Sequence, residues 1–131
     1  MKSTLRILFL ILSVSLLGCS KENFTPNIVG DWNIQRFTQT EKNGDELQRC
    51  PDYWDAGHLT IRSDRTATLN MMNTVYQYTY TQKDEIITFN EEGTGLILPY
   101  TIRYSSNNEL IIDHFHKDGN YQVSRTFILT K

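Results

Sequence analysis

The sequence ELIIDHFHKDGNYQVSRTFILT, residues 109–130, decides the fold class of this chain. Apolar and polar side chains alternate with the period of two that a half-buried strand requires, first over residues 109–116 and again over residues 121–130. Between these segments stands Lys117-Asp118-Gly119-Asn120, in which Asp-Gly is a strong signal for a tight hairpin turn. The stretch therefore predicts two antiparallel strands joined by a short turn.

The same pattern of short β-prone segments and turn residues extends back toward the N-terminus. After the N-terminal apolar run, no segment shows a sustained helical period. Six further strands are predicted at residues 29–40, 58–62, 66–72, 74–81, 85–89 and 95–104. Eight consecutive strands joined mostly by short turns remove their edges by closing on themselves. The predicted fold is therefore all-β, an eight-stranded antiparallel up-and-down barrel, and an open sandwich of two four-stranded sheets is the alternative.

The N-terminal segment has the pattern of an export signal. Lys2 and Arg6 precede an apolar run at residues 7–17 that is too short to span a bilayer. The run ends in Leu16-Leu17-Gly18-Cys19, which resembles the bacterial lipobox. That resemblance implies that residues 1–18 are a lipoprotein signal peptide and that Cys19, the new N-terminus, carries acyl chains such as palmitate. The alternative is an ordinary secretory signal that happens to precede a Cys.

Residues 19–27 are predicted to comprise the lipidated Cys19 and a polar linker. Each buried methylene contributes about 0.8 kcal/mol to membrane binding, so two or three acyl chains hold a protein permanently. Ser20-Lys21-Glu22-Asn23 resembles the tags that send lipoproteins to the outer surface in some Gram-negative lineages, and a solvated linker is the alternative. We therefore expect an outer-membrane lipoprotein of the cell envelope, which is surface-exposed if the tag is genuine.

Composition indicates one domain and argues against nucleic acid as a partner. Removing residues 1–18 leaves 113 of 131 residues, enough for a single domain, which we place at residues 28–131. Lys2 and Arg6 leave with the signal, so 11 of the 13 Lys and Arg residues remain against 15 Asp and Glu, a net charge of −4. Cys50 is then the one remaining Cys, and we expect it to be buried as a small apolar residue, with intermolecular pairing or reactivity as alternatives.

The first predicted strand opens with Gly30-Asp31-Trp32, and Gly-x-Trp at this place in an eight-stranded meander resembles the lipocalin signature. The whole segment from Ile28 onward is similar to the small lipocalin-like domains of bacterial lipoproteins. The resemblance implies that Trp32 packs at the closed end of the barrel beneath an Arg of the last strand, for which Arg125 is the candidate. A desolvated cation–π contact of this kind contributes about 2 kcal/mol.

A set of tyrosines is predicted to line the barrel interior. Tyr76, Tyr78 and Tyr80 share one face of their strand, as do Leu96, Leu98, Tyr100, Ile102 and Tyr104, and Tyr121 joins them from the last strand. An apolar lining dotted with hydroxyls suits an amphipathic ligand, and the alternative is that these rings fill a solid core.

Tyr53 and Trp54 fall in a predicted long loop at residues 50–57. In lipocalin-like folds this loop covers the cavity mouth, so the pair is interpreted as a lid over the ligand. It is alternatively an exposed recognition spot for a protein or glycan, because aromatic residues with polar handles dominate such patches, or it packs on the barrel end.

The chain lacks the motifs that carry catalysis, such as Gly-x-Ser-x-Gly and His-Glu-x-x-His. His114 and His116 share a face and have the spacing of metal ligands, with His58 or Cys50 as a remote third ligand, but no acidic cluster accompanies them. We expect no enzyme activity, no metal and no cofactor, the alternative being an enzyme that uses His114 or His116 as acid or base. The predicted function is a lipid-anchored envelope protein that binds a small hydrophobic or amphipathic molecule, and the alternative is a solid barrel whose loops bind an envelope protein or glycan.

Overall fold

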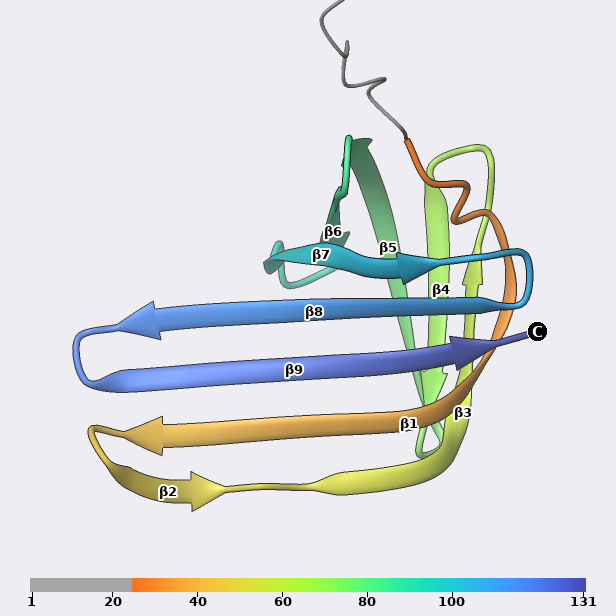
Figure 1. Ribbon diagram of the computed structural model, residues 1–131. Coiled ribbons are helices and arrows are strands. Elements are labelled where there is room, and N and C mark those ends of the chain that lie inside the picture. The colour runs from red at the N-terminus through yellow and green to blue at the C-terminus, as the bar shows by residue number, and fades with distance from the viewer. Residues whose placement is uncertain (1–24) are drawn as a thin grey trace, which may run out of the picture.

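The computed structural model describes residues 25–131, and within this range the chain forms strands and no helix (Figure 1). The nine strands are β1 (Gly30–Asn43), β2 (Glu46–Arg49), β3 (Asp52–Ile61), β4 (Thr66–Met71), β5 (Thr74–Lys83), β6 (Ile86–Glu91), β7 (Ile97–Ser105), β8 (Glu109–Asp118) and β9 (Tyr121–Thr130). The predicted signal peptide, Cys19 and the tag that follows it lie outside the described residues. None of the residues from 25 onward belongs to a helix that could cross a membrane.

Strand pairing closes the sheet into a barrel. From β3 to β9 each strand pairs antiparallel with the next one along the chain, and β1 pairs antiparallel with both β3 and β9. Eight strands thus form the barrel wall, while β2 pairs with the end of β1. The predicted eight-stranded up-and-down barrel is confirmed. All nine strands and the hydrophobic core lie within residues 28–131, so this segment contains the complete barrel.

The predicted loop at residues 50–57 is wrong, because most of it belongs to β3. Tyr53 is paired with Phe37 across the β1–β3 ladder. A short break at Cys50-Pro51 separates β2 from β3, since Pro has no N–H to donate to a ladder. Gly57, at φ +140°, lies so close to the neighbouring strand that an added Cβ would be 2.0 Å from the Asn70 carbonyl oxygen. Pro51 and Gly57, which indicated a loop in the sequence, mark a break and a close strand approach.

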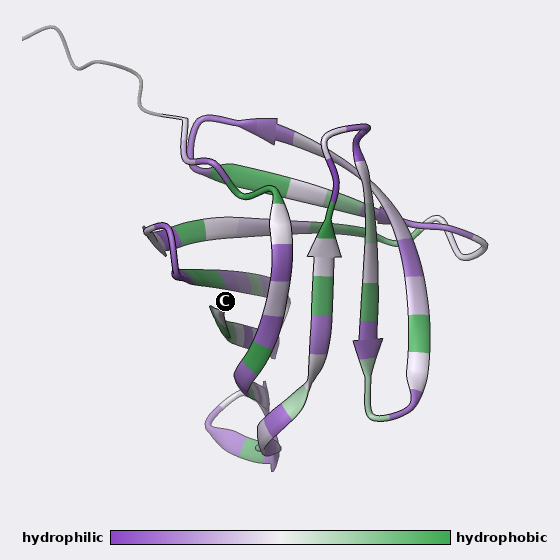
Figure 2. Cartoon of the chain, turned by 90° about the vertical axis from the view of Figure 1, so that its right-hand side faces the viewer, coloured by the Kyte–Doolittle hydropathy of each residue, from purple (hydrophilic) through white to green (hydrophobic). Residues whose placement is uncertain are grey.

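The inward-facing side chains form a single core. Bands of hydrophobic and hydrophilic residues alternate along the strands in Figure 2, as the period of two requires. The largest fully buried side chains are Trp32, Ile28, Ile34, Ile61, Ile87, Leu110, Ile112 and Leu129. At one end, which we call the closed end, the Trp32 indole N–H donates to the Ile28 carbonyl oxygen at 2.9 Å and the Tyr80 hydroxyl donates to the Arg62 carbonyl oxygen at 2.6 Å. The closed end is therefore sealed by packed rings whose polar atoms have backbone partners.

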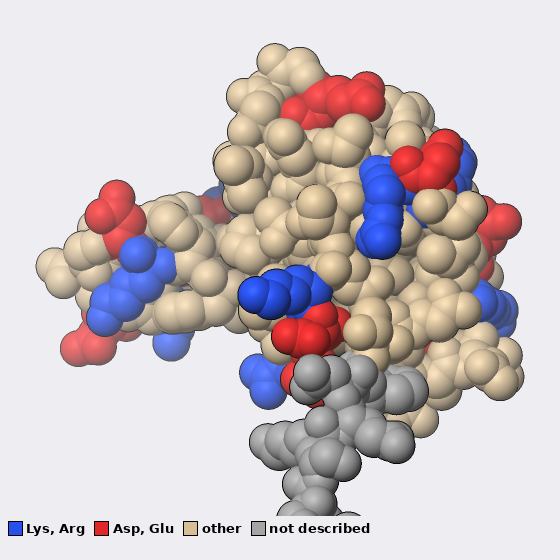
Figure 3. Space-filling model, turned by 90° about the horizontal axis from the view of Figure 1, so that it is seen from above, with Lys and Arg blue, Asp and Glu red and all other residues tan. Residues whose placement is uncertain are grey.

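Four strands continue past the barrel wall as a projection that we call the arm, residues 40–49 and 115–124 (Figure 1). The strand order across it is β2-β1-β9-β8. Seen from above in Figure 3, the arm stands out from the barrel and carries charged side chains of both signs. Most of its residues are exposed, so it extends the barrel wall without adding a second core.

Candidate functional site

A hollow of about 360 Å³ opens at the end of the barrel opposite Trp32, and we call it the mouth cup. Its volume lies near the lower end of the range of ligand pockets, about 300–1,000 Å³. Its aromatic lining consists of Phe37, Tyr53, Tyr76, Tyr78, Tyr100 and Phe127, its aliphatic lining of Leu69, Met71, Leu96 and Leu98, and its polar lining includes Gln39, Arg49, Glu91 and Arg125. The mouth cup therefore offers an apolar wall with a small number of polar groups.

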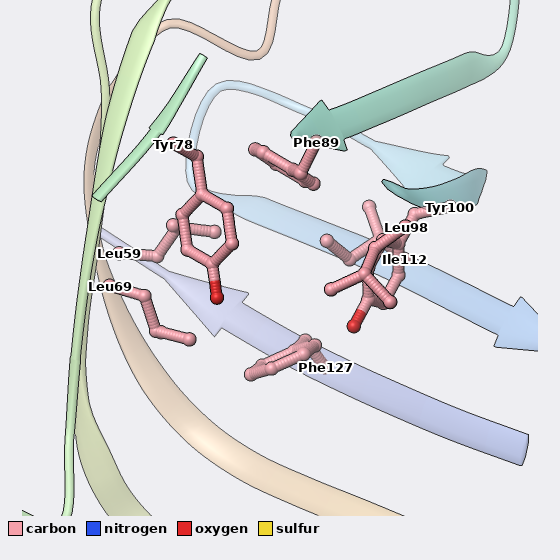
Figure 4. Close-up of a pocket in the computed structure, with 8 residues that line it drawn as sticks. All are labelled: Leu59, Leu69, Tyr78, Phe89, Leu98, Tyr100, Ile112 and Phe127. Carbon is pink, nitrogen blue, oxygen red and sulfur yellow. The ribbon is translucent and has the colours of Figure 1, made fainter. Parts of the chain in front are cut away.

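Deeper inside, the barrel is filled. The hollow drawn in Figure 4 has a volume of about 30 Å³, far below the roughly 300 Å³ at the lower end of the range of ligand pockets. Phe89 contacts Tyr78 and Tyr100 edge to face, with ring centroids 5.6 and 5.8 Å apart, and Tyr100 contacts Phe127 in the same way at 5.9 Å. The solid-core alternative thus describes the interior, and the space for a ligand is at the mouth.

Four of the eight aromatic residues predicted to bind ligand line the mouth cup. Tyr76, Tyr78 and Tyr100 face it from β5 and β7, as the period of two predicted. Tyr53 joins them from β3, its ring parallel to that of Phe37 at a centroid distance of 6.4 Å. These residues come from strands that are distant in sequence and meet only because the barrel closes.

Three of the other predicted residues do not reach the mouth cup. Tyr80 is buried at the closed end. Tyr104 was predicted to face inward, and this is wrong: a register shift between Ile102 and Tyr104 inserts an extra residue in β7, so the Tyr104 side chain is 50% exposed. Tyr121 is also wrongly placed by the prediction, because it lies in the arm, where its hydroxyl donates to Glu41 Oε2 at 3.2 Å.

Trp54 faces outward from β3 and is 62% exposed, so the predicted lid is wrong. The guanidinium of Arg36 lies over its ring, 4.8 Å from the centroid. Arg36 also forms a two-pronged ion pair with Asp52, at 2.9 and 2.8 Å. These hydrogen bonds raise the pKa of Arg36 and lower the pKa of Asp52. Trp54 is therefore an exposed ring held by a charged pair, and its role as a recognition spot stays a prediction.

The predicted contact between Arg125 and Trp32 is wrong, whereas the burial of Trp32 at the closed end is confirmed. Asn33 pairs with Thr130, so the residue that reaches Trp32 is Lys131, whose Nζ lies 4.5 Å from the centre of the indole ring. Gly30 leaves room for this lysine, since a Cβ there would be 2.8 Å from the Lys131 side chain. Arg125, six residues earlier, faces the mouth cup instead.

Arg125 belongs to a hydrogen-bond network that joins β9, β1 and β2 where the arm begins. Its Nε donates to Gln39 Oε1 at 2.8 Å, and the Gln39 amide donates to Glu41. Glu41 also accepts from Tyr121 and lies 3.9 Å from an Arg49 nitrogen. Gln39 and Arg49 were not predicted as site residues, and only the pairing of β1 with β9 and β2 reveals them.

The buried tyrosines of the mouth cup are held in their protonated form. Burial raises the pKa of Tyr100 to about 12, and the positive charge of Arg125 and its hydrogen bond with the Tyr100 hydroxyl work against this increase. Burial also raises the pKa of Tyr78, with a further contribution from the charge of Glu91. Both side chains therefore stay O–H donors at neutral pH.

His114 is a packing residue in the barrel wall. It is 6% exposed, and its Nδ1 donates to the Pro99 carbonyl oxygen at 2.7 Å, which fixes the tautomer. Burial lowers its pKa, and Arg125 and His116 lower it further, while the bond to Pro99 acts in the opposite direction. Among residues 25–131, no three His, Cys, Asp or Glu side chains are placed to hold a metal ion together. Cys50 is exposed at the break before β3, so its expected burial is wrong.

A second hollow of about 270 Å³ lies where β7 and β8 separate. Their ladder extends from Ser105 only as far as the Thr101–Asp113 pair, so the β8 residues beyond Asp113 continue into the arm without β7. This groove, which we call the β7–β8 groove, shares Leu96, Leu98 and Arg125 with the mouth cup. Arg125 therefore lies between two neighbouring hollows.

Comparison of the chain with family models, with curated proteins and with solved structures finds no match. The lipocalin resemblance therefore stays a prediction about the family, whereas the barrel fold is observed. Evidence for function comes from the chemistry of the mouth cup and from the sequence of the N-terminal segment.

Proposed function

We propose that this chain is a lipid-anchored cell-envelope protein that binds a small hydrophobic or amphipathic molecule in the mouth cup. The observation that carries the proposal is the cup itself, about 360 Å³ of open space lined by six aromatic rings and a few polar groups at one end of a filled barrel. Aromatic and aliphatic walls with a few polar groups are typical of ligand pockets.

The position of residues 25–28, where the described chain begins, is compatible with the anchored arrangement. Residues 25–28 pack at the closed end, where the Gln82 amide donates to the Pro26 carbonyl oxygen at 2.8 Å and Ile28 covers Trp32. An anchor on Cys19 would therefore attach to the closed end, and the mouth cup would face away from the membrane surface. A ligand could then enter from the aqueous side.

The test uses residues 20–131 without Cys19, purified after export and analysed by native mass spectrometry for small molecules that leave on denaturation. We expect a reproducible adduct, and saturable binding of the neutral probe N-phenyl-1-naphthylamine. Tyr76→Ala removes part of the cup wall and should weaken probe binding several-fold. Tyr104→Ala removes an exposed tyrosine outside the cup and should leave binding unchanged.

A clean apo mass after exposure to envelope lipid extract, together with no saturable probe binding, would overturn the proposal. The alternative is an interaction module that binds a protein or glycan through its surface. One observation favours it specifically, the 62% exposure of Trp54 above the Arg36–Asp52 pair. A pull-down of envelope components that Trp54→Ala abolishes and Tyr76→Ala spares would support this alternative.

A further inference from the structure

We propose that the mouth cup selects amphiphiles with a negatively charged head, such as a carboxylate, and that Arg125 binds this head. This inference rests on the proposed binding function and adds the chemical class of the ligand. Arg125 is partly buried and lines both the mouth cup and the β7–β8 groove, so its guanidinium lies at the junction of the two hollows.

Arg125 is a cation without an anionic partner among residues 25–131. The partner of its Nε is the neutral amide oxygen of Gln39, at 2.8 Å. The ion pairs in this part of the chain join Arg36 to Asp52, Arg49 to Glu41 and Arg103 to Asp113, and none includes Arg125. Withdrawing a charge from water costs free energy unless an opposite charge compensates it. An anion that enters the cup would supply that compensation.

The carboxylate in this network and the one that lines the cup already have donors. Glu41 accepts hydrogen bonds from Gln39 and Tyr121. Glu91, on the rim of the cup, accepts from the Thr94 hydroxyl at 2.5 Å within its own turn. Neither carboxylate forms an ion pair with Arg125. The Arg125 side chain is bonded to Gln39 and to the Tyr100 hydroxyl, both neutral, and its remaining N–H donors are available to a ligand.

Two tyrosine hydroxyls add neutral donors beside this cation. The hydroxyl oxygens of Tyr78 and Tyr100 are directed to the same side of the pocket in Figure 4. Both rings are buried and both hydroxyls keep their protons at neutral pH, for the reasons given above. A carboxylate has two oxygens that accept several hydrogen bonds, so it matches a guanidinium flanked by O–H donors. The aromatic wall of the cup would hold the apolar part of the same ligand.

The experiment compares three probes of equal chain length: dodecanoate, dodecanol and dodecylammonium. Each displaces N-phenyl-1-naphthylamine from residues 20–131, and the affinities are determined at pH 7.5. We expect dodecanoate to bind at least tenfold more tightly than the other two. Arg125→Gln should weaken dodecanoate binding at least tenfold and so remove this preference. The control is Arg103→Gln, because Arg103 is exposed on the outside of β7 and paired with Asp113 at 2.6 Å.

The outcomes separate this inference from the proposed function. Saturable binding of all three probes with equal affinity, insensitive to Arg125→Gln, would overturn the headgroup inference and leave the binding function standing. Tighter binding of dodecylammonium would also overturn it. No saturable binding of any probe would overturn the proposed function itself. If Arg125→Gln does not fold, the salt dependence of the wild type decides: the dodecanoate affinity should fall with added NaCl, and unchanged affinity would contradict the role of Arg125.

Discussion

Tyr80 and Tyr100 are buried to nearly the same extent, 4% and 5% exposed, yet they lie at opposite ends of the barrel. The Tyr80 hydroxyl donates to a backbone carbonyl, and the guanidinium of Arg65 lies over its ring, 5.6 Å from the centroid. The Tyr100 ring lines the mouth cup, and its hydroxyl has a hydrogen bond with the Arg125 side chain. Burial alone therefore does not distinguish a tyrosine that supports the fold from one that lines a site, whereas the partner of the hydroxyl does.

The same contrast holds for the cations at the two ends. At the closed end, Lys131 covers the Trp32 ring, and its backbone N–H donates to the Asn108 carbonyl oxygen at 3.0 Å. At the mouth, Arg125 is held by Gln39 and borders open space. The closed end thus uses its polar groups for stability, while the mouth keeps some of them available. Substitutions at the closed end should lower stability, and substitutions at the mouth should alter binding.

The largest expected effect comes from removing the ring that fills the closed end. Trp32→Ala deletes a side chain that is 1% exposed and should lower the free energy of unfolding by about 3–5 kcal/mol. Trp54→Ala is the matched control, because Trp54 is 62% exposed on the barrel wall, and it should change stability by about 0.5 kcal/mol. Urea unfolding of residues 20–131, followed by far-UV circular dichroism, measures both. Equal losses would contradict the division between the closed end and the barrel surface.

Local sequence signals predicted the strands and most of their faces. Alternation over residues 76–80 placed three tyrosines on the inner face correctly, and Asp118-Gly119 located the last hairpin. These features depend on neighbours a few residues away, where turn chemistry and the pleat of a strand decide the outcome. Closure of the eight strands into a barrel was also predictable, because an open meander of that length would leave its edge strands exposed.

Features that depend on register between distant strands were predicted poorly. One extra residue in β7 moved Tyr104 to the outside, and a sequence pattern does not reveal such a bulge. Trp32 meets Lys131 because Asn33 pairs with Thr130, a relation set by the closure of β1 on β9. The same limitation applied to the prediction of the mouth cup. The inward-facing tyrosines of single strands were predictable. The grouping of Gln39 and Arg49 with Arg125 was not, because it depends on the pairing of β1 with β2 and β9.

A smaller effect is expected from deleting single hydroxyl groups at the two ends. Tyr80→Phe removes the hydroxyl hydrogen bond to the Arg62 carbonyl oxygen, which keeps only the longer bond from the Arg65 N–H at 3.3 Å, so unfolding should become about 1 kcal/mol easier. Tyr100→Phe should leave stability almost unchanged and weaken dodecanoate binding several-fold. Thermal melting and probe displacement on both variants measure the two quantities. If Tyr80→Phe altered binding, or if Tyr100→Phe altered stability alone, the functional difference between the two ends would not hold.

The smallest expected effect is the contribution of His114, in the barrel wall between the two ends, to the pH dependence of stability. Its pKa is lowered mainly by burial, so below about pH 6.5, the ordinary value for histidine, the unfolded chain binds a proton that the folded chain does not bind. Stability should therefore fall as the pH decreases from 7.5 to 5.5. Above this range both states leave His114 neutral, so His114 should no longer make stability depend on pH. His114→Gln should flatten this dependence, whereas His116→Gln, at an exposed position two residues away on the same strand face, should retain it. Urea unfolding at several pH values gives the slope for each variant. A wild-type slope that His114→Gln leaves intact would assign the pH dependence to other groups, and the bond between His114 and Pro99 would then contribute to packing alone.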